Sequence, residues 1–215
     1  MKAEPVSKGT IEKDLLRKFR FIVGCDEVGR GCLAGSVYAS AVILDYSKLE
    51  VLADKQKKLI RDSKTLSKKQ REDCLLWLPD LCLDAATCFA SVSEIETLGI
   101  LKASFLAMQR ALQSLKLKFD FILIDGKQTL AAYPNSLQKA VIKGDSLCYS
   151  IAAASIFAKQ ARDLYMAQQA KVFPGYFFED HVGYGTKKHK EALELYGVTS
   201  LHRKNYAPIR ELLSR

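Results

Sequence analysis

The chain has 215 residues, and 48% of them are apolar, which is enough to bury one core of ordinary size. Lys and Arg number 33 against 24 Asp and Glu, so the formal net charge is +9. No segment approaches the roughly 20 consecutive apolar residues of a membrane-spanning helix, and the N-terminal stretch is charged where a secretory signal would be apolar. We therefore expect one main domain in a cytoplasmic protein without membrane attachment.

The pattern of apolar residues predicts an α/β domain with strands and helices along one chain. Alternating or wholly apolar stretches predict strands at residues 20–25, 36–44, 84–93, 119–126 and 139–145. Apolar residues at helical spacing predict helices at residues 67–78, 99–115, 146–169, 186–195 and 206–213. These elements divide the chain into a polar lead-in at 1–18, a main domain at 19–170 and a helical extension at 171–215.

Three of the apolar segments end in acidic residues. Asp26 and Glu27 follow the first, Asp125 lies at the end of the fourth and Asp145 ends the fifth. If these strands are neighbours, four carboxylates converge, and their repulsion requires compensation by lysine or arginine, or by divalent metal. Ligands that are all oxygen, without clustered His or Cys, favour Mg²⁺ or Mn²⁺, and a pair of such ions suits phosphodiester cleavage. The alternative is that each acid merely caps a helix or a turn.

Glycines follow the first acidic pair in a spacing that has a second interpretation. The residues Gly29, Gly31 and Ala34 match the dinucleotide-binding fingerprint, which must open a helix whose N-terminus holds the pyrophosphate. Here the next segment, "SVYASAVIL", is typical of a strand, and two carboxylates stand where the pyrophosphate would approach. We therefore expect no dinucleotide site.

Positive charge is concentrated in two blocks of the chain. Residues 51–71 carry eight Lys and Arg against two Asp, and residues 181–215 carry seven against three Glu. A solubilising surface is the simple explanation, but this clustering favours an anionic partner such as nucleic acid.

Cysteines and histidines indicate structural roles. None of the six cysteines pair as CxxC, and most lie in apolar runs, which predicts free thiols rather than disulfides or zinc ligands. His181, His189 and His202 have no cysteine nearby, so we expect no zinc site, and we expect His202 to help dock the C-terminal tail. Lys159 and Asp163 stand four apart on the long helix and predict an ion pair.

Six ordered motifs resemble bacterial ribonuclease HII, of the type 2 ribonuclease H family, over residues 20–210. They are "CDEVGRGCLAG", "DSKTLSKKQRE", "IDG", "KGDSLCYSIAAASIFAKQARD", "GYGTKKHKEAL" and "HRKNYAP". The resemblance implies a ribonuclease H-like fold, with a mixed central sheet flanked by helices and a small C-terminal helical extension. It also implies a monomeric endonuclease that cuts RNA/DNA hybrids and duplex DNA containing a ribonucleotide, on the 5′ side of the ribonucleotide, leaving 3′-hydroxyl and 5′-phosphate ends.

The same resemblance assigns the site residues. It implies catalysis with two ions, Mg²⁺ or Mn²⁺, held by Asp26, Glu27, Asp125 and Asp145. It implies substrate contacts by Gly29, Arg30, Gly31, Tyr184, Lys64 and Lys143, and by the basic block at 187–190. In this assignment the glycines let the backbone approach a ribose and read its 2′-hydroxyl, while Tyr184 packs on the neighbouring sugar and the lysines contact phosphates.

The sequence departs from the family at a few positions and leaves two other functions open. Cys32 and Ser36 stand where the family usually has proline, Gly99 where it commonly has asparagine, and "KGDS" where "KGDA" is commoner. No motif for binding the sliding clamp is visible, so that partner is not expected. The alternatives are a hybrid or duplex binder without catalysis, and a different nuclease of the same fold, such as a resolvase.

Overall fold

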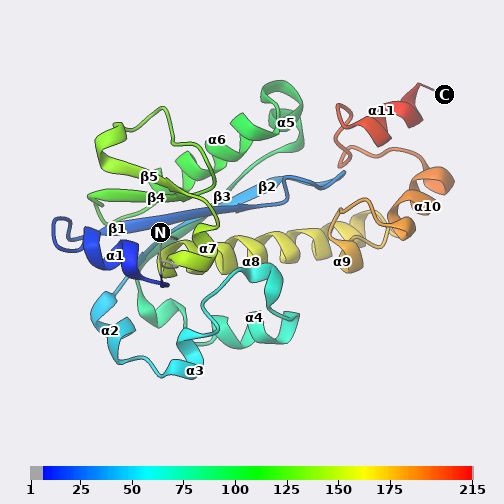
Figure 1. The fold of residues 1–215 in the computed structure, drawn as a ribbon. Helices are drawn as coiled ribbons and strands as arrows, with labels where there is room; N and C mark the ends of the chain where they lie inside the picture. The colour runs from blue at the N-terminus through cyan, green and yellow to red at the C-terminus, as the bar shows by residue number, and fades with distance from the viewer. Residues whose placement is uncertain (1–6, 215) are drawn as a thin grey trace, which may run out of the picture.

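The computed structural model describes residues 7–214, which form one five-stranded sheet covered by helices on both faces (Figure 1). The strand order is β3-β2-β1-β4-β5; β1 pairs antiparallel with β2 and β2 with β3, whereas β1 pairs parallel with β4 and β4 with β5. The sheet is therefore mixed, as expected. The strands are β1 (Ile22–Val28), β2 (Val37–Leu44), β3 (Cys82–Ala90), β4 (Phe121–Asp125) and β5 (Gln138–Val141).

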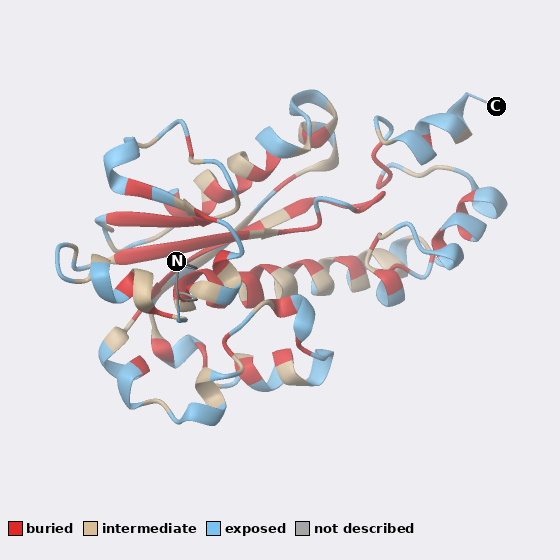
Figure 2. Cartoon of the chain, in the orientation of Figure 1, coloured by how far each residue is buried: buried red, intermediate tan, exposed pale blue. Residues whose placement is uncertain are grey.

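The long helix α8 lies on one face of the sheet and α6 on the other (Figure 1). Alanines 152–154 of α8 are fully buried, so this helix comes close to β1. A Cβ atom on Gly24 of β1 would lie 2.3 Å from the carbonyl carbon of Ser150, so only glycine permits that approach. Strands β1, β2 and β4 are buried over most of their length, whereas β3 alternates between half-buried and exposed residues (Figure 2). The larger helices are α4 (Lys68–Leu75), α5 (Val92–Leu98), α6 (Ile100–Gln113), α8 (Tyr149–Val172), α10 (Lys187–Tyr196) and α11 (Ala207–Leu213).

Shorter helical segments connect these elements. They are the α-helices α1 (Thr10–Leu15), α2 (Tyr46–Val51), α3 (Asp54–Lys57), α7 (Gly144–Leu147) and α9 (Phe178–His181), and the 3-10 turns η1 (Ser63–Thr65), η2 (Pro79–Leu81) and η3 (Asn135–Leu137). No helix among residues 7–214 has the length and hydropathy to cross a membrane.

The described part of the polar lead-in holds a helix that the sequence analysis did not expect, whereas residues 1–6 lie outside the described part. Glu12 of α1 is 1% exposed. Its carboxylate accepts hydrogen bonds from the backbone N–H groups of Tyr149 and Ser150, at 3.0 and 2.8 Å, and from the Tyr46 hydroxyl at 3.0 Å. Because the first amides of a helix have no partner within it, Glu12 stabilises the start of α8.

Several predicted boundaries were wrong for local reasons. The first strand continues to Val28, so Asp26 and Glu27 lie within it and do not follow it. The strand predicted at 139–145 ends at Val141, and Asp145 lies in the first turn of α7. The third strand stops at Ala90 because a capping box at Ser91 begins α5.

Helix boundaries also differ from the expectation at two places. Gly99, with φ 77°, separates α5 from α6, so the helix predicted at 99–115 begins one residue later and a further helix precedes it. Cys148 has extended backbone angles, so the helix predicted at 146–169 is divided into α7 and α8. The other predicted strands and helices are confirmed within a few residues of their ends.

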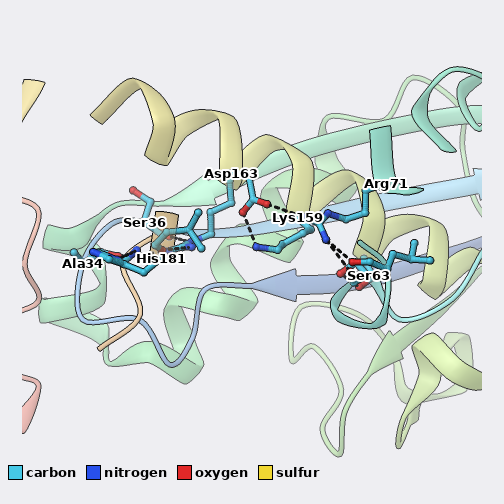
Figure 3. Close-up of polar contacts among 12 residues, drawn as sticks. Ala34, Ser36, Ser63, Arg71, Lys159, Asp163 and His181 are labelled. Atoms are coloured by element: carbon cyan, nitrogen blue, oxygen red, sulfur yellow. Dashed lines mark hydrogen bonds and ion pairs between the residues drawn. The ribbon is translucent and has the colours of Figure 1, made fainter. Parts of the chain in front are cut away.

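An ion-pair cluster on α8 confirms the predicted contact between Lys159 and Asp163 (Figure 3). The Lys159 Nζ lies 2.6 Å from the Asp163 carboxylate, and Arg71 of α4 lies 3.2 Å from the other oxygen of that carboxylate. The cluster therefore ties α4 to the long helix. All six cysteines are free, as expected.

Candidate functional site

The sheet brings the four predicted carboxylates to one edge. Cys25 of β1 pairs with Ile124 of the parallel strand β4, so Asp26 and Asp125 follow at the same level. Asp145 lies on α7, directly after β5, which pairs parallel with β4. The carboxyl ends of parallel strands form one edge, and this is where α/β folds commonly bind ligands.

The charge of Asp125 acts on Asp26, Glu27 and Asp145, so Asp125 is the common neighbour of the other three carboxylates. Asp26 is 5% exposed, and its pKa is raised well above the usual range by burial and then by the charges of Glu27 and Asp125. The pKa of Asp145 is raised by burial and then by Asp62 and Asp125. Burial also raises the pKa of Glu27. Each of these groups therefore favours a cation nearby.

Protein donors already satisfy part of the carboxylate set. The Arg30 Nη1 lies 3.1 Å from the Glu27 Oε1, the Gly144 N–H donates to the Asp125 Oδ1 at 2.7 Å, and the Glu27 N–H donates to the Asp26 Oδ1 at 2.7 Å. Among residues 7–214, no group of three or more His, Cys, Asp or Glu side chains is arranged as a metal-binding cluster. Three of the four carboxylates, those of Asp26, Glu27 and Asp125, therefore each accept a hydrogen bond within the protein.

Lys64 is a predicted phosphate contact that lies beside the carboxylates. Partial burial opposes its charge, but Asp26 and Asp62 outweigh that effect and raise the pKa of Lys64. Asp62 also accepts the Lys64 N–H at 2.9 Å, which fixes the η1 turn. Lys64 and Tyr184 interact electrostatically, so Tyr184 lies on the same side of the molecule as the acids. Lys143 is exposed and has a left-handed backbone, with φ 56°, directly before α7.

The two glycines on either side of Arg30 lie in different surroundings. A Cβ on Gly31 would meet nothing within 4 Å, and both Arg30 and Gly31 are exposed, so the backbone here is open to a ligand. A Cβ on Gly29, which has φ 98°, would lie 2.2 Å from the Nε of Arg162. Gly29 therefore clears space for a buried arginine, and its contact with a sugar stays a prediction.

Two clefts adjoin the acidic edge. One, of about 420 Å³, is lined by Glu27, Arg30 and Asp125 together with residues of α6. The other, of about 520 Å³, lies next to Asp145 and has an excess of basic side chains. It is lined by Lys8, Asp54, Lys57, Lys58, Ile60, Arg61, Asp62, Thr65, Ser146 and Tyr149. The edge is thus flanked by one cleft whose two carboxylates are balanced by Arg30 and Lys127 and by a second cleft that is basic, an arrangement suited to a polyanion that must approach carboxylates.

The comparisons with known proteins now decide the family. The family model described as Ribonuclease HII matches residues 23–209. The chain belongs to the ribonuclease HII family. A curated ribonuclease HII from Pelagibacter ubique (strain HTCC1062) is 44% identical over 194 residues, which cover 90% of this chain and 100% of the relative. As a member of the ribonuclease HII family, the chain is a ribonuclease H endonuclease, a hydrolase of a family that cleaves RNA in RNA/DNA hybrids.

Solved structures support the fold of this ribonuclease HII. The ribonuclease H2 from Pyrococcus horikoshii OT3 superposes with a TM-score of 0.73 at 23% identity, covering 91% of this chain and 98% of that one. The Bst ribonuclease HIII in complex with Mn²⁺ superposes with a TM-score of 0.69 at 18% identity, covering 90% of this chain and 69% of that one. The ribonuclease H-like fold expected from the motifs is confirmed.

Sequence reasoning missed two arginines that lie beneath the glycine loop. Arg162 and Arg203 are both fully buried. A signal for Arg162 was present, because it continues the buried stripe of Ala154 and Ala158 at a spacing of four residues. Arg203 follows His202 in the tail. His202 is buried and pairs with Ala34, so its predicted docking role is confirmed.

Proposed function

We propose that this ribonuclease HII cuts the phosphodiester on the 5′ side of a ribonucleotide, both in RNA/DNA hybrids and at single ribonucleotides in duplex DNA. The products carry 3′-hydroxyl and 5′-phosphate ends, and the activity serves the removal of ribonucleotides from DNA by a monomeric cytoplasmic protein. The observation that carries the proposal is the group of four carboxylates at one sheet edge, beside a basic cleft and an open glycine loop.

The carboxylates suit divalent cations. All four donors are oxygen, Asp26 is nearly buried, and the charges of its neighbours raise its pKa, so two Mg²⁺ or Mn²⁺ ions would relieve a repulsion that the protein leaves in place. The Mn²⁺ complex of the structurally similar ribonuclease HIII agrees with this choice of ion. Asp26, Glu27, Asp125 and Asp145 would hold the ions.

When bound, the cations would activate water and stabilise the leaving oxygen, which is the chemistry that they supply in phosphodiester hydrolysis. The residues of the chain position the substrate. Glu27, paired with Arg30, faces the cleft next to α6, and the half-exposed side chain of Arg30 lies near the phosphate of a bound substrate. Lys64 carries its charge beside Asp26, where it reduces the repulsion between the acids and an approaching phosphate backbone.

Recognition of the ribonucleotide lies with the residues around the acids. The backbone of Gly29, Arg30 and Gly31 reads the 2′-hydroxyl, which both donates and accepts a hydrogen bond, and the open space at Gly31 supports this role. Tyr184 packs on the neighbouring sugar. Lys64, Lys143 and the block at 187–190 contact phosphates, where charge matters more than geometry.

A duplex with one ribonucleotide, labelled at the 5′ end of the strand that contains it, tests the proposal in Mg²⁺ and in Mn²⁺. We expect one product ending in a 3′-hydroxyl before the ribonucleotide, and no cleavage of the all-DNA duplex. Asp26→Asn should abolish cleavage, whereas Asp14→Asn, which changes an exposed carboxylate on α1, should leave it unchanged. A parent protein that binds the labelled duplex but leaves it intact in both ions would overturn the proposal, as would cutting that does not depend on the 2′-hydroxyl.

A further inference from the structure

Two buried guanidinium groups lie beneath the glycine loop at residues 29–36. Arg162 and Arg203 are each 0% exposed, and neither forms an ion pair with a carboxylate among residues 7–214. Buried charges are ordinarily paired, because desolvation is costly. Here backbone carbonyls of the loop take the place of the counter-ion. Arg162 donates to the carbonyls of Ala34, Ser36 and Val182 at 2.8 to 3.1 Å (Figure 3).

Arg203 holds the part of the loop that faces the acids. Its Nη2 donates to the carbonyl of Gly29 at 2.7 Å, and its Nη1 donates to the carbonyl of Arg30 at 2.9 Å. Its Nε and Nη2 both donate to the carbonyl of Gly35, at 2.9 and 2.7 Å. The hydroxyl of Tyr206 donates a second hydrogen bond to the Arg30 carbonyl, at 2.8 Å. Two consecutive carbonyls are therefore fixed from beneath.

The planarity of the peptide bond fixes what lies on the other side. In a trans peptide the carbonyl and the following N–H point in opposite directions, and the described residues contain no cis bond. Because Arg203 holds the Gly29 and Arg30 carbonyls inward, the N–H groups of Arg30 and Gly31 point outward. Both residues are exposed, and no acceptor among residues 7–214 takes either N–H. Two adjacent unpaired donors form a concavity suited to an oxygen.

The C-terminal extension also holds this loop through its backbone. The Arg203 N–H donates to the Leu33 carbonyl and the Gly35 N–H donates to the Leu201 carbonyl, both at 2.8 Å. These bonds place the guanidinium of Arg203 under the loop in a single register. The extension therefore sets the direction of the Arg30 and Gly31 amides through contacts that do not touch the substrate.

We propose that Arg203 and Tyr206 are positioning residues for ribonucleotide recognition: they hold the Gly29 and Arg30 carbonyls so that the following two amides face the 2′-hydroxyl. This inference rests on the proposed function, since it assigns the orientation of the same glycine loop. It adds that selectivity for ribose depends on residues 201–215, which contain none of the four carboxylates at the sheet edge.

The test uses Tyr206→Phe, with Tyr176→Phe as the matched control. Tyr206 is only partly buried, and the change removes its hydrogen bond to the loop together with the one that its hydroxyl accepts from the Arg203 Nη1 at 3.1 Å. Tyr176→Phe removes a tyrosine-to-carbonyl bond of similar length, 2.7 Å to Gly197, within the same extension but away from the loop. Two quantities are measured for each protein: kcat/KM on a duplex with one ribonucleotide, and the Kd for the all-DNA duplex.

We expect Tyr206→Phe to lower kcat/KM on the ribonucleotide duplex about five-fold, the effect of one neutral hydrogen bond, and to leave the Kd for all-DNA duplex unchanged. The control should change neither quantity. Arg203→Lys keeps the positive charge but loses the planar guanidinium that donates to several carbonyls at once. We expect it to lower kcat/KM on the ribonucleotide duplex about fifty-fold or more. If Arg203→Lys does not fold, Tyr206→Phe still decides the matter.

The outcomes separate this inference from the proposed function. A parent that cuts at the ribonucleotide while Tyr206→Phe behaves like Tyr176→Phe overturns the inference and leaves the function standing. If Tyr206→Phe lowers kcat/KM on the ribonucleotide duplex and the affinity for the all-DNA duplex by the same factor, Tyr206 has a structural role alone. That result also overturns the inference. A parent that does not distinguish ribonucleotide from DNA removes the proposed function, and the inference with it.

Discussion

The histidine pair beneath the Tyr184 segment makes the stability of this ribonuclease HII sensitive to acid. The His202 Nδ1 accepts the Thr199 N–H at 2.9 Å, so the proton of this ring is on Nε2, which lies 3.1 Å from the His189 Nε2. The His189 Nδ1 in turn lies 2.9 Å from the Tyr184 carbonyl, an acceptor, and must donate to it. The partners therefore define two neutral rings, and protonation of either ring places two N–H groups against each other.

The magnitude follows from the pKa values. Both rings are fully buried, and burial lowers the pKa of His189 and of His202 from the ordinary value of 6.5 to about 4. Between pH 6.5 and 4 the unfolded chain therefore binds protons that the folded chain does not. Stability is fully present above pH 6.5 and falls as the pH falls. From pH 7.5 to 5.5 each ring costs about 1.4 kcal/mol, and the pair about 3 kcal/mol.

Urea unfolding at pH 7.5 and 5.5 measures this loss, with the double variant His189→Asn and His202→Asn as the comparison. Carboxylates and His181 titrate in both proteins, so the difference between the two losses isolates the pair. We expect the parent to lose about 3 kcal/mol more than the double variant, and a single variant to show about half of that difference. Equal losses in the parent and the double variant would show that the rings are not held neutral.

Further predictions concern the acids, the helix start and the loop. Asp26→Asn should abolish cleavage yet raise the free energy of unfolding by about 1 kcal/mol, since it removes one buried like charge; loss of stability in urea would contradict this. Glu12→Gln should destabilise by about 2 kcal/mol through the start of α8, seen as a lower melting temperature with unchanged kcat. Gly29→Ala should cost at least about 2 kcal/mol and lower cleavage, because its Cβ meets Arg162 at a positive φ; wild-type stability would refute the contact. Chelation of divalent ions with EDTA should stop cleavage and leave the circular dichroism spectrum unchanged, and cleavage that persists would exclude a metal site.

Much of the acidic edge could be predicted from the sequence because it depends on local patterns. Apolar runs that contain or end in carboxylates place Asp26 near the end of β1 and Asp125 at the end of β4, and the sheet order makes these strands neighbours. Asp145 reaches the same edge from the short helix α7. A helix of four residues is too short to show a helical pattern of apolar residues in the sequence. The capping boxes at Ser67 and Ser91, which begin α4 and α5, are local in the same way.

The contacts that hold the loop could not be predicted, because they join residues far apart in the chain. Arg203 bonds to carbonyls 168 to 174 residues earlier, and no sequence pattern records where a backbone carbonyl points. Gly29 was assigned to a ligand because glycine signals close approach, but the sequence does not say which neighbour approaches. The burial of Glu12 also depends on a helix start that lies 137 residues away.

The distance between Arg203 and the loop has a consequence for synthesis of the chain. All four acids precede Arg203 in the chain, so the predicted cutting groups are translated before the residue that we propose aims the amides of Arg30 and Gly31. An arrest of translation or a proteolytic nick before residue 203 would therefore separate the residue proposed to set the choice of sugar from a chain that still contains all four acids.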